Sequence, residues 1–475
     1  MREFFAADGW LNLAISTIQD YIWTFLLIAV LLGCAVWFTI RTKFVQFRMI
    51  GEMVRLLGES AVNGPTHHKH ISSFQAFAVS VATRVGTGNL AGVATAIATG
   101  GPGAVFWMWI IALLGSATAF VESTLAQLFK QHSNESFIGG PAYYILHGLH
   151  SPKMANAFAV MITLTFALSY NSIQSNTICS AMNEAFGFDN FYTGIVLAAI
   201  SLLIVFGGIH RIAKVSSILV PIMAFGYFIL KIFIVIKNFD LIPHVFNVIF
   251  ESAFGVGPFA GGALGTAIMN GVKRGLFSNE AGEGSAPNVA ATASTSHPVK
   301  QGLIQALGVF TDTILVCSCT AFVILISGLY NSPELQGIAL TQNALNSEIG
   351  SAGSIYIAIA IFLFAFSSII GNYYYGEANV RFLSKKQWPV TALRIFSAGI
   401  MVILGALASL DFVWSLGDLF MALLTAINLI AITLLCKYAF RLLDDYRNQK
   451  KKGIKSPVFH RSQLPEIENE IDCWE

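Results

Sequence analysis

The stretch Ala82-Thr-Arg-Val-Gly-Thr-Gly-Asn-Leu-Ala-Gly92 interrupts an otherwise apolar run that extends over residues 74–99. The run is long enough to cross a bilayer as a helix. However, Gly86 and Gly88 weaken a helix interior, and Arg84 is costly at membrane depth. A helical break here frees backbone N–H and C=O groups that lipid cannot satisfy. We therefore expect these groups to face protein, water, an ion or a substrate.

A second stretch, Lys273-Arg-Gly-Leu-Phe-Ser-Asn-Glu-Ala-Gly-Glu-Gly-Ser285, interrupts the apolar run 261–293 in the same way. Four positions match when the two stretches are aligned: Arg84 with Arg274, Asn89 with Asn279, Ala91 with Ala281 and Gly92 with Gly282. The matches indicate an internal repeat. Paired interrupted spans are the best sequence pointer to the binding site of a secondary transporter.

The composition is typical of a membrane protein. Of the 475 residues, 55% are hydrophobic and only 11% are charged, whereas charged residues make up about a quarter of a soluble domain. The 41 Gly and 38 Phe suit a bundle whose helices pack closely through small residues. A net charge of +2 argues against nucleic acid as a partner. The six Cys form no CxxC pair, and we interpret them as small packing residues.

Eleven apolar stretches predict an all-α polytopic membrane protein with about 11 transmembrane helices. They lie at 21–40, 74–99, 103–129, 155–181, 191–207, 215–235, 261–293, 302–329, 355–375, 390–410 and 412–440. The segment 1–16 lacks the basic start of a signal peptide, so we expect the first span to be retained. We interpret 139–145, 241–254 and 332–349 as connecting helices, and we expect the charged tail after Asp444 to be mobile.

Lys and Arg gather in alternate loops, which predicts the orientation of the chain. The basic loops lie at 41–69, 130–153, 211–214, 300 and 381–386, and the tail is basic at 441–452. Lys237 is the one basic residue that we find in the opposite set of loops. The pattern predicts a cytoplasmic C-terminus and, because the span count is odd, an N-terminus outside the cell.

The break in the second span can hold two ligands of opposite charge. A half-helix that begins near Gly88 directs unpaired N–H groups and a positive dipole end into the gap, which suits a carboxylate. Thr87 and Asn89 add side-chain hydrogen bonds. The half-helix that ends at residues 82–85 exposes carbonyl oxygens, which suit a small cation such as Na⁺. A packing kink is the alternative interpretation.

Polar residues in two other spans are candidates for the same site. Ser367 and Ser368 in the ninth span can offer hydroxyl oxygens to a cation, although a Ser pair in a membrane helix also bonds to its own backbone. The fourth span holds Asn171, Gln174, Ser175 and Asn176 within two turns. Because lipid would not tolerate all of them, some must face a cavity, and we select Gln174.

Asp312 lies near the middle of the eighth span, where a buried carboxylate needs a partner. One interpretation is an ion pair with Arg84, Arg274 or Lys273, and the other is a ligand for a coupling ion or a proton. The position of the residues across the membrane suggests a different partner for Arg84, because Arg84 and Glu283 both fall on the cytoplasmic side of the breaks. We hypothesise that Arg84 and Glu283 form an inner gate.

Other classes of protein find little support. No HExxH, GxSxG, P-loop or nucleotide-binding fingerprint occurs in a fitting context, so we expect neither enzymatic activity nor a cofactor. The cluster His67-His-Lys-His70 resembles a metal-binding tract, but its basic loop favours a solvated and partly cationic surface. A passive channel predicts a polar stripe along several spans, whereas polarity here concentrates at the two breaks.

Four motifs stand in order along the chain. They are Val85-Gly-Thr-Gly-Asn-Leu-Ala-Gly-Val-Ala-Thr-Ala-Ile97, Gly100-Gly-Pro-Gly-Ala-Val-Phe-Trp107, Gly139-Gly-Pro-Ala-Tyr-Tyr144 and Ser278-Asn-Glu-Ala-Gly-Glu-Gly-Ser-Ala-Pro287. These motifs resemble those of the alanine/glycine:cation symporter family, the sodium:alanine symporters. The likeness extends from about residue 74 to residue 440.

The resemblance implies a leucine-transporter-like fold of two inverted five-helix repeats plus one extra N-terminal helix. The expected parts are 1–70 for the extra helix and a cytoplasmic loop, 71–240 for the first repeat with its break at 82–92, 241–440 for the second repeat with its break at 273–285, and 441–475 for a cytoplasmic tail. It also implies a sodium-coupled symporter in the inner membrane that imports a small neutral amino acid, alanine or glycine, by alternating access.

The resemblance further implies roles for individual residues. The expected Na⁺ ligands are the carbonyls of Ala82, Val85 and Phe364 and the hydroxyls of Ser367 and Ser368. The substrate carboxylate is expected to meet the backbone of Gly86 to Gly88, with Thr87 and Asn89. The side-chain pocket is expected to be lined by Phe277 and by the backbone near Gly275.

Asn372 departs from the pattern of the family, because we expect Trp at this position in many members. A smaller polar residue can enlarge the pocket. Glutamine or another neutral amino acid is therefore the alternative substrate, and H⁺ is the alternative coupling ion. The sequence leaves the oligomeric state open.

Overall fold

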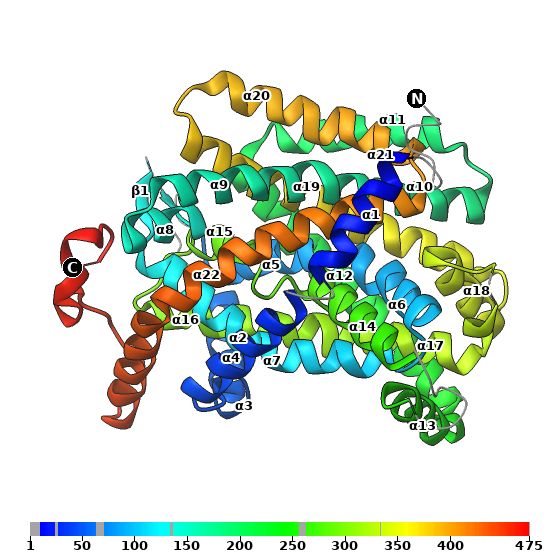
Figure 1. The fold of residues 1–475 in the computed structure, drawn as a ribbon, viewed down its shortest axis with the longest axis horizontal. Coiled ribbons are helices and arrows are strands. Elements are labelled where there is room, and N and C mark those ends of the chain that lie inside the picture. Colours follow the sequence, from blue (N-terminus) through cyan, green and yellow to red (C-terminus); the bar gives the residue numbers. More distant parts are fainter. Residues whose placement is uncertain are drawn as a thin grey trace.

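The computed structural model describes residues 10–23, 27–62, 71–133, 136–255, 263–332 and 334–474 of the chain. Helices dominate these ranges and pack into one bundle, across which the long helix α22 (Leu410–Lys451) runs (Figure 1). The described residues form a single sheet, a two-stranded antiparallel hairpin of β1 (Gln131–Ser133) and β2 (Ser136–Ile138). The cluster at 67–70 lies outside the described ranges.

The nine uninterrupted spans of the sequence prediction coincide with helices. In chain order they are α2 (Ile28–Arg41); α7 (Ala104–Leu128); α9 (Pro152–Ile162) with η3 (Thr163–Tyr170) and α10 (Asn171–Phe186); α11 (Asn190–Val205); α12 (Gly208–Lys237); α16 (Pro298–Val309) with η6 (Phe310–Cys317) and α17 (Ser318–Ser327); α19 (Ala352–Leu383); α20 (Gln387–Ile395) with η8 (Phe396–Ile400) and α21 (Met401–Leu407); and α22.

The helical, multi-pass character of the prediction is confirmed, but the count of eleven spans is not. Within the described ranges, six helices are long and apolar enough to cross a membrane. A seventh results if α11 and the first part of α12, which are bent by 116°, form one span. Length and hydropathy do not count the interrupted spans, because their pieces are shorter than 18 residues.

Both predicted interruptions are present. The second span consists of α5 (Ser73–Arg84), a π-helical turn η2 (Gly88–Gly92) and α6 (Val93–Gly100). A capping box of Ser72 and Gln75 begins α5, and α5 ends where Val85 adopts a ψ of 85°. The seventh span consists of α14 (Ala263–Asn279) and α15 (Ala286–Ala290).

The second break is a true turn of the chain rather than a gentle kink. Three of its residues have left-handed backbone angles, with φ of 56° at Glu280, 98° at Gly282 and 77° at Gly284. Glycine adopts such angles without steric cost, whereas Glu280 must be held there by its surroundings. The two glycines of the motif therefore account for the shape of this segment.

The remaining helices lie between the spans or at the ends of the chain. They are α1 (Trp10–Ile22), α3 (Val45–Arg48), α4 (Ile50–Val62), α8 (Pro141–Leu149), α13 (Ile242–Ala253), α18 (Gly337–Ile349), η4 (Phe239–Leu241), η7 (Leu329–Asn331), η9 (Arg461–Gln463) and η10 (Pro465–Glu470). Helices α8, α13 and α18 confirm the three predicted connecting helices.

The prediction of a mobile tail after residue 444 is wrong for the part of the tail that the structure describes. Helix α22 continues to Lys451, and the chain beyond it packs against the bundle through buried apolar side chains. Trp474 is almost fully buried, and its indole N–H donates to the carbonyl of Gln127 at 3.0 Å. Aromatic and aliphatic residues scattered through the charged tail supply the apolar surface that fixes it.

The tail side of the bundle also contains a small electrostatic cluster around Glu52. Burial raises the pKa of the Glu52 carboxyl, but hydrogen bonds from Arg55, Tyr446 and Lys450 outweigh this effect and bring the pKa to about 2. The hydroxyl of Tyr446 donates at 2.6 Å, and the ammonium of Lys450 lies at 3.2 Å. The cluster joins α4 to the end of α22.

Because the pKa of Glu52 is lower in the folded protein, its stabilising contribution is present above pH ~4.5 and is lost as the pH falls towards 2. We expect Glu52→Gln to lower the melting temperature of the purified protein at neutral pH. The difference from the original protein should shrink as the pH is lowered below ~4.5. Glu184→Gln, at an exposed position, is the control. An effect of Glu52→Gln that is equal at neutral and acid pH would contradict the cluster.

Candidate functional site

The two breaks touch each other in the interior of the bundle. A Cβ atom built on Gly88 would lie 3.0 Å from the Cα of Ser278 and 3.2 Å from the ring of Phe277. Only glycine allows this approach of the two backbones. The interrupted spans α5–α6 and α14–α15 thus lie in direct contact, which is the arrangement that a site shared by the two breaks requires.

Oxygen atoms gather where α5 ends. The hydroxyl of Ser368 lies within hydrogen-bonding distance of the carbonyls of Ala82 at 2.8 Å, Thr83 at 3.2 Å and Phe364 at 3.1 Å. The hydroxyl of Ser367 lies 3.3 Å from the Ala82 carbonyl and 2.8 Å from that of Phe364. All these groups are buried.

Four of the five predicted cation ligands therefore converge, namely Ala82, Phe364, Ser367 and Ser368. The fifth, Val85, is the residue at which the chain leaves the helix. Neutral carbonyl and hydroxyl oxygens are ligands that suit a hard cation. Each hydroxyl can turn a lone pair towards an ion, because it is free to rotate about its C–O bond.

Gly86 lies directly behind this oxygen cluster. A Cβ atom on Gly86 would overlap the Oγ of Ser368 and would lie 3.0 Å from the Oε1 of Gln174. No side chain fits at this position without moving both neighbours. Gly86 is therefore in contact with Ser368, one of the predicted cation ligands, on one side and with Gln174 on the other.

The N–H groups of the first break are directed at oxygen acceptors. The Oε1 of Gln174 accepts hydrogen bonds from the backbone N–H of Thr87 at 3.1 Å and from its hydroxyl at 2.7 Å. The Oδ1 of Asn89 accepts from the N–H of Gly86 at 2.9 Å. The structure thus brings Gln174, Thr87 and Asn89 together as predicted, around N–H groups that can hold a carboxylate.

Asp312 connects the two breaks instead of forming an ion pair. Its Oδ1 accepts from the amide of Asn89 at 2.7 Å, and its Oδ2 accepts from the hydroxyls of Ser278 at 2.7 Å and Thr313 at 2.8 Å. No basic side chain of the described residues lies within ion-pair distance of Asp312. Arg274 is paired with Asp418 instead.

The predicted ion pair between Arg84 and Glu283 is not present in this conformation. The Nη1 of Arg84 donates to the carbonyl of Gln305 at 3.2 Å, and its Nε and Nη2 atoms have no hydrogen-bond partner. Glu283 accepts from the hydroxyl of Tyr170 at 3.2 Å and 3.4 Å. Both Arg84 and Glu283 are fully buried.

Three aromatic rings meet beside the contact of the two breaks. The ring of Phe277 packs edge-on against Tyr170 and Trp414, with 4.7 Å between ring centroids in each pair. Gly275 is placed differently from the expectation, because a Cβ on it would lie 2.5 Å from Ile111 of α7. Phe277 thus lies at the site, whereas Gly275 lets α14 approach α7.

Asn372 is buried, and both atoms of its side-chain amide lack a hydrogen-bond partner. It follows Ser368 by four residues on α19, so the two side chains lie on the same face of the helix. That face is directed towards the first break, because Ser368 contacts it. A buried amide without a partner is costly, which marks Asn372 as a candidate for contact with a polar ligand.

Sequence reasoning missed Glu122 of α7. Its two carboxylate oxygens accept from the backbone N–H groups of Gly282 and Gly284 at 3.2 Å each, and from the amide of Asn428 at 2.8 Å. The carboxylate holds the unwound segment of the seventh span in place. A single acidic residue inside an apolar span was the available signal.

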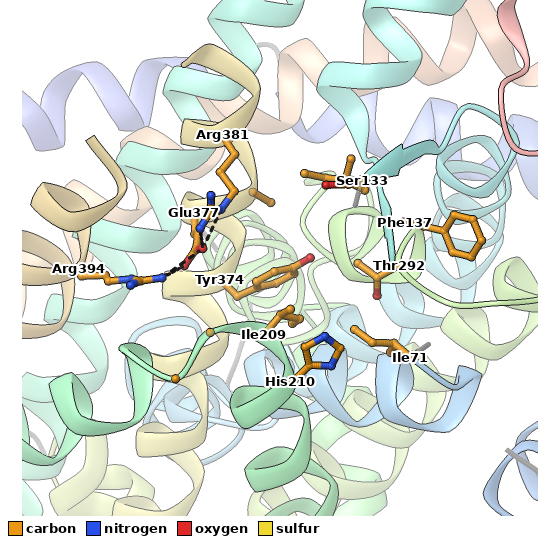
Figure 2. Close-up of a pocket in the computed structure, with 14 residues that line it drawn as sticks. Ile71, Ser133, Phe137, Ile209, His210, Thr292, Tyr374, Glu377, Arg381 and Arg394 are labelled. Atoms are coloured by element: carbon orange, nitrogen blue, oxygen red, sulfur yellow. Dashed lines mark hydrogen bonds and ion pairs between the residues drawn. The ribbon is translucent and has the colours of Figure 1, made fainter. Parts of the chain in front are cut away.

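Cavities lie at both ends of the interrupted second span. One, of about 470 Å³, opens beside residues that precede α5 and follow α15 (Figure 2). Figure 2 shows Glu377 bound to both Arg381 and Arg394 at its wall, with Tyr374 and His210 nearby. The other, of about 300 Å³, is lined by residues at the end of α6 and the start of α22, including Thr99, Trp414 and Asp418.

Known proteins that resemble the chain are transporters. A family model described as "Sodium:alanine symporter family" matches residues 8–461. The chain is 52% identical over 456 residues to the probable sodium/glutamine symporter GlnT of Bacillus subtilis (strain 168), a match that covers 96% of this chain and 94% of that protein. It is 47% identical to the amino-acid carrier protein AlsT of the same organism, over 98% of each chain. It is 36% identical to the sodium/alanine symporter AgcS of Methanococcus maripaludis, over 89% of this chain and 94% of that protein.

Proposed function

Because the chain belongs to the sodium:alanine symporter family and is a multi-pass, sodium-coupled amino-acid symporter, we propose that it imports a small neutral amino acid by alternating access. The observation that carries this proposal is the arrangement around Gly86. Gly86 lies between the oxygen cluster around Ser368 and the N–H group of Thr87. The proposed cation site and the proposed carboxylate site are therefore one residue apart along the backbone.

In the proposed mechanism, Na⁺ binds to the carbonyls of Ala82, Val85 and Phe364 and to the hydroxyls of Ser367 and Ser368. The carboxylate of the amino acid binds the N–H groups of Gly86 to Gly88, with Thr87 and Asn89, and displaces Gln174. Na⁺ orders the end of α5, and the same backbone then receives the substrate. Binding of either ligand therefore strengthens binding of the other.

Alternating access requires that the site open to one side at a time. The contact between Gly88 and the segment Phe277–Ser278 closes the centre in this conformation, between the two cavities. We assign the ion pair of Arg274 and Asp418, which lies beside Trp414, to the outer side. We retain Arg84 and Glu283 as residues of the inner side, without a direct pair in this state.

The architecture that we propose has two five-helix repeats at 71–240 and 241–440, related by inversion, with α2 as the extra helix. The matching breaks in α5–α6 and α14–α15 support the repeat. The basic loops support a cytoplasmic C-terminus and an N-terminus outside the inner membrane. The 470 Å³ cavity then opens to the cytoplasm.

The unpartnered amide of Asn372 favours glutamine over alanine or glycine as the substrate. Glutamine carries a side-chain amide that can satisfy both atoms of Asn372, whereas a methyl group cannot. The printed name of the 52% identical relative, a probable sodium/glutamine symporter, agrees with this choice. Glutamine is thus the alternative substrate that this observation favours within the same transport function.

We expect Asn372→Trp to lower glutamine uptake relative to alanine uptake by about tenfold or more, because an unmet hydrogen-bonding requirement discriminates strongly between substrates. Competition between the two radiolabelled amino acids in proteoliposomes measures the ratio. Asn448→Trp, at an exposed position on α22, is the control. An unchanged ratio would place Asn372 outside the side-chain pocket.

The function itself is tested by uptake of alanine, glycine and glutamine into proteoliposomes, with and without an inward Na⁺ gradient. We expect at least one of the three to accumulate above equilibrium only when the gradient is present. Uptake that merely equilibrates and ignores Na⁺ would identify a facilitator or channel. Accumulation driven by a proton gradient alone would make H⁺ the coupling ion.

A further inference from the structure

Four carboxyl groups lie in the sealed core around one basic side chain. Glu122, Glu280, Glu283 and Asp312 are each at most 1% exposed, and among the described residues the guanidinium of Arg84 is the cation that acts on all four. Burying an unpaired charge costs many kcal/mol, so groups in such a core become neutral instead. One cation cannot balance four carboxylates, and most of these groups must therefore hold protons.

The hydrogen-bond donors distinguish the ionised carboxyl from the neutral ones. Glu122 accepts three N–H groups, from Gly282, Gly284 and Asn428. An N–H group can only donate, so Glu122 must offer lone pairs on both oxygens. Such a carboxylate is stabilised in its charged form. Glu122 and Arg84 therefore balance each other's charge.

The other three carboxyl groups receive fewer donors. Asp312 accepts one N–H group, from Asn89, besides two hydroxyls. Among the described residues, Glu280 accepts from two hydroxyls and from no N–H group, with Ser285 at 2.5 Å and Thr83 at 3.3 Å. A hydroxyl can accept as well as donate, so these contacts allow a proton on the carboxyl.

Glu283 is the least supported of the four. Its hydrogen bonds come from one hydroxyl, that of Tyr170, at 3.2 Å and 3.4 Å. The charged and titratable groups that face it are Tyr170 on η3, Glu280 in the same break, Glu122 on α7 and Arg84 on α5. Two of these four are acidic side chains, which oppose a negative charge on Glu283.

Arg84 gives an independent observation at the same place. It is 1% exposed, yet its Nε and Nη2 atoms have no acceptor, and it forms no ion pair with any described residue. A guanidinium with free N–H groups in a closed core would bind an available carboxylate. Glu122 is already held by three N–H donors, so the isolation of Arg84 indicates that the other carboxyls around it, Glu283 among them, are not charged.

We propose that the carboxyl group of Glu283 is a proton-binding site, which is loaded when the core is sealed and exchanges its proton with cytoplasmic water when the inner side opens. The step is a simple dissociation, in which the O–H bond of the acid breaks and the proton goes to water. This inference rests on the proposed function and orientation. It adds a third ligand, H⁺, at a position separate from the Na⁺ ligands and from the substrate N–H groups.

The proposal predicts how internal pH acts on transport. An ionised Glu283 opposes closure of the core, so the inner side closes again only after a proton binds. Na⁺-driven uptake should therefore fall as the pH inside the vesicle rises. For a single proton, the loaded fraction falls up to about tenfold for each pH unit.

The test uses proteoliposomes with a fixed external pH, a fixed Na⁺ gradient and an internal pH varied from about 6 to 9. We expect Glu283→Gln, which copies the neutral acid, to keep Na⁺-driven uptake and to lose most of its dependence on internal pH. Glu184→Gln, which is exposed, should keep the original profile. The same profile in Glu283→Gln and in the original protein overturns the proposal.

A second measurement tests the proton site even if the variant does not transport. Difference infrared spectroscopy of the purified protein detects the C=O stretch of a protonated carboxyl. A band present at neutral pH and missing from Glu283→Gln supports the proposal, and an original protein whose spectrum is unchanged by the substitution overturns it. If no variant shows Na⁺-driven uptake at any pH, the transport function fails, whereas the infrared result still decides the proton site.

Discussion

Gly86→Ala should abolish Na⁺-driven amino-acid uptake, with a loss of roughly 100-fold or more. The new methyl group would overlap the hydroxyl of Ser368 and press on the amide oxygen of Gln174. Overpacking a tight interior costs about 1–3 kcal/mol, and about 2.7 kcal/mol corresponds to a factor of 100. The substitution therefore disturbs a proposed cation ligand and the proposed substrate-binding N–H groups at the same time.

Uptake of radiolabelled substrate at saturating Na⁺, normalised to the amount of protein in the vesicles, measures the Gly86→Ala effect. Gly33→Ala on α2 is a matched control, because a Cβ there meets no atom within 4 Å. The control should transport normally. If Gly86→Ala retains most of its uptake, the close contact between the proposed cation ligands and the break does not serve transport.

Ser368→Ala should raise the Na⁺ concentration needed for half-maximal uptake by about 10- to 100-fold. A hydrogen-bonding or coordinating interaction with a charged group contributes about 1.5–3 kcal/mol, which corresponds to this range. The hydroxyl of Ser368 contacts the carbonyls of Ala82 and Phe364, so its removal takes one oxygen from the centre of the cluster. The rate at saturating Na⁺ should change much less.

The dependence of uptake on Na⁺ concentration, at constant ionic strength, gives the Ser368→Ala result. Ser347→Ala on α18 serves as the control, because that hydroxyl bonds only to the carbonyl of Ala344 in its own helix. An unchanged Na⁺ requirement in Ser368→Ala would move the cation site away from α19.

Features fixed by local chemistry could be predicted from the sequence. Glycines and polar residues inside apolar runs predicted both breaks, because a helix cannot keep Gly86, Gly88 and a nearby Arg84 in lipid without a special environment. The hydroxyl pair at Ser367 and Ser368 was predicted for the same reason. The structure places these groups beside the first break.

Pairings between distant helices could not be predicted in the same way. Arg274 meets Asp418, which is 144 positions away, and Arg84 meets a backbone carbonyl of Gln305, which no side-chain pattern reveals. The partner of a buried charge depends on which helices are neighbours. The sequence therefore indicated that Arg84 and Glu283 needed special environments but not what those environments were.

Two further features differ from the sequence prediction, namely the role of Glu122 and the packing of the tail, and each has a signal in the sequence. Glu122 could have been singled out as the one acidic residue in its span, and its role as an acceptor for Gly282 and Gly284 required the fold. The charged residues of the tail predict mobility, whereas Trp474 and its apolar neighbours supply the surface that packs against the bundle. In both cases the signal is one or a few residues that differ from the average composition of the segment around them.

The central claim is that one backbone segment binds Na⁺ and the amino acid together. The most direct test is the affinity of the purified protein for its amino acid in Na⁺ and in K⁺, together with the affinity for ²²Na⁺ with and without the amino acid. The account predicts that each ligand strengthens the other by the same factor, of roughly 5- to 150-fold, because coupling between two sites is reciprocal. Equal amino-acid affinity in Na⁺ and in K⁺ would contradict the account.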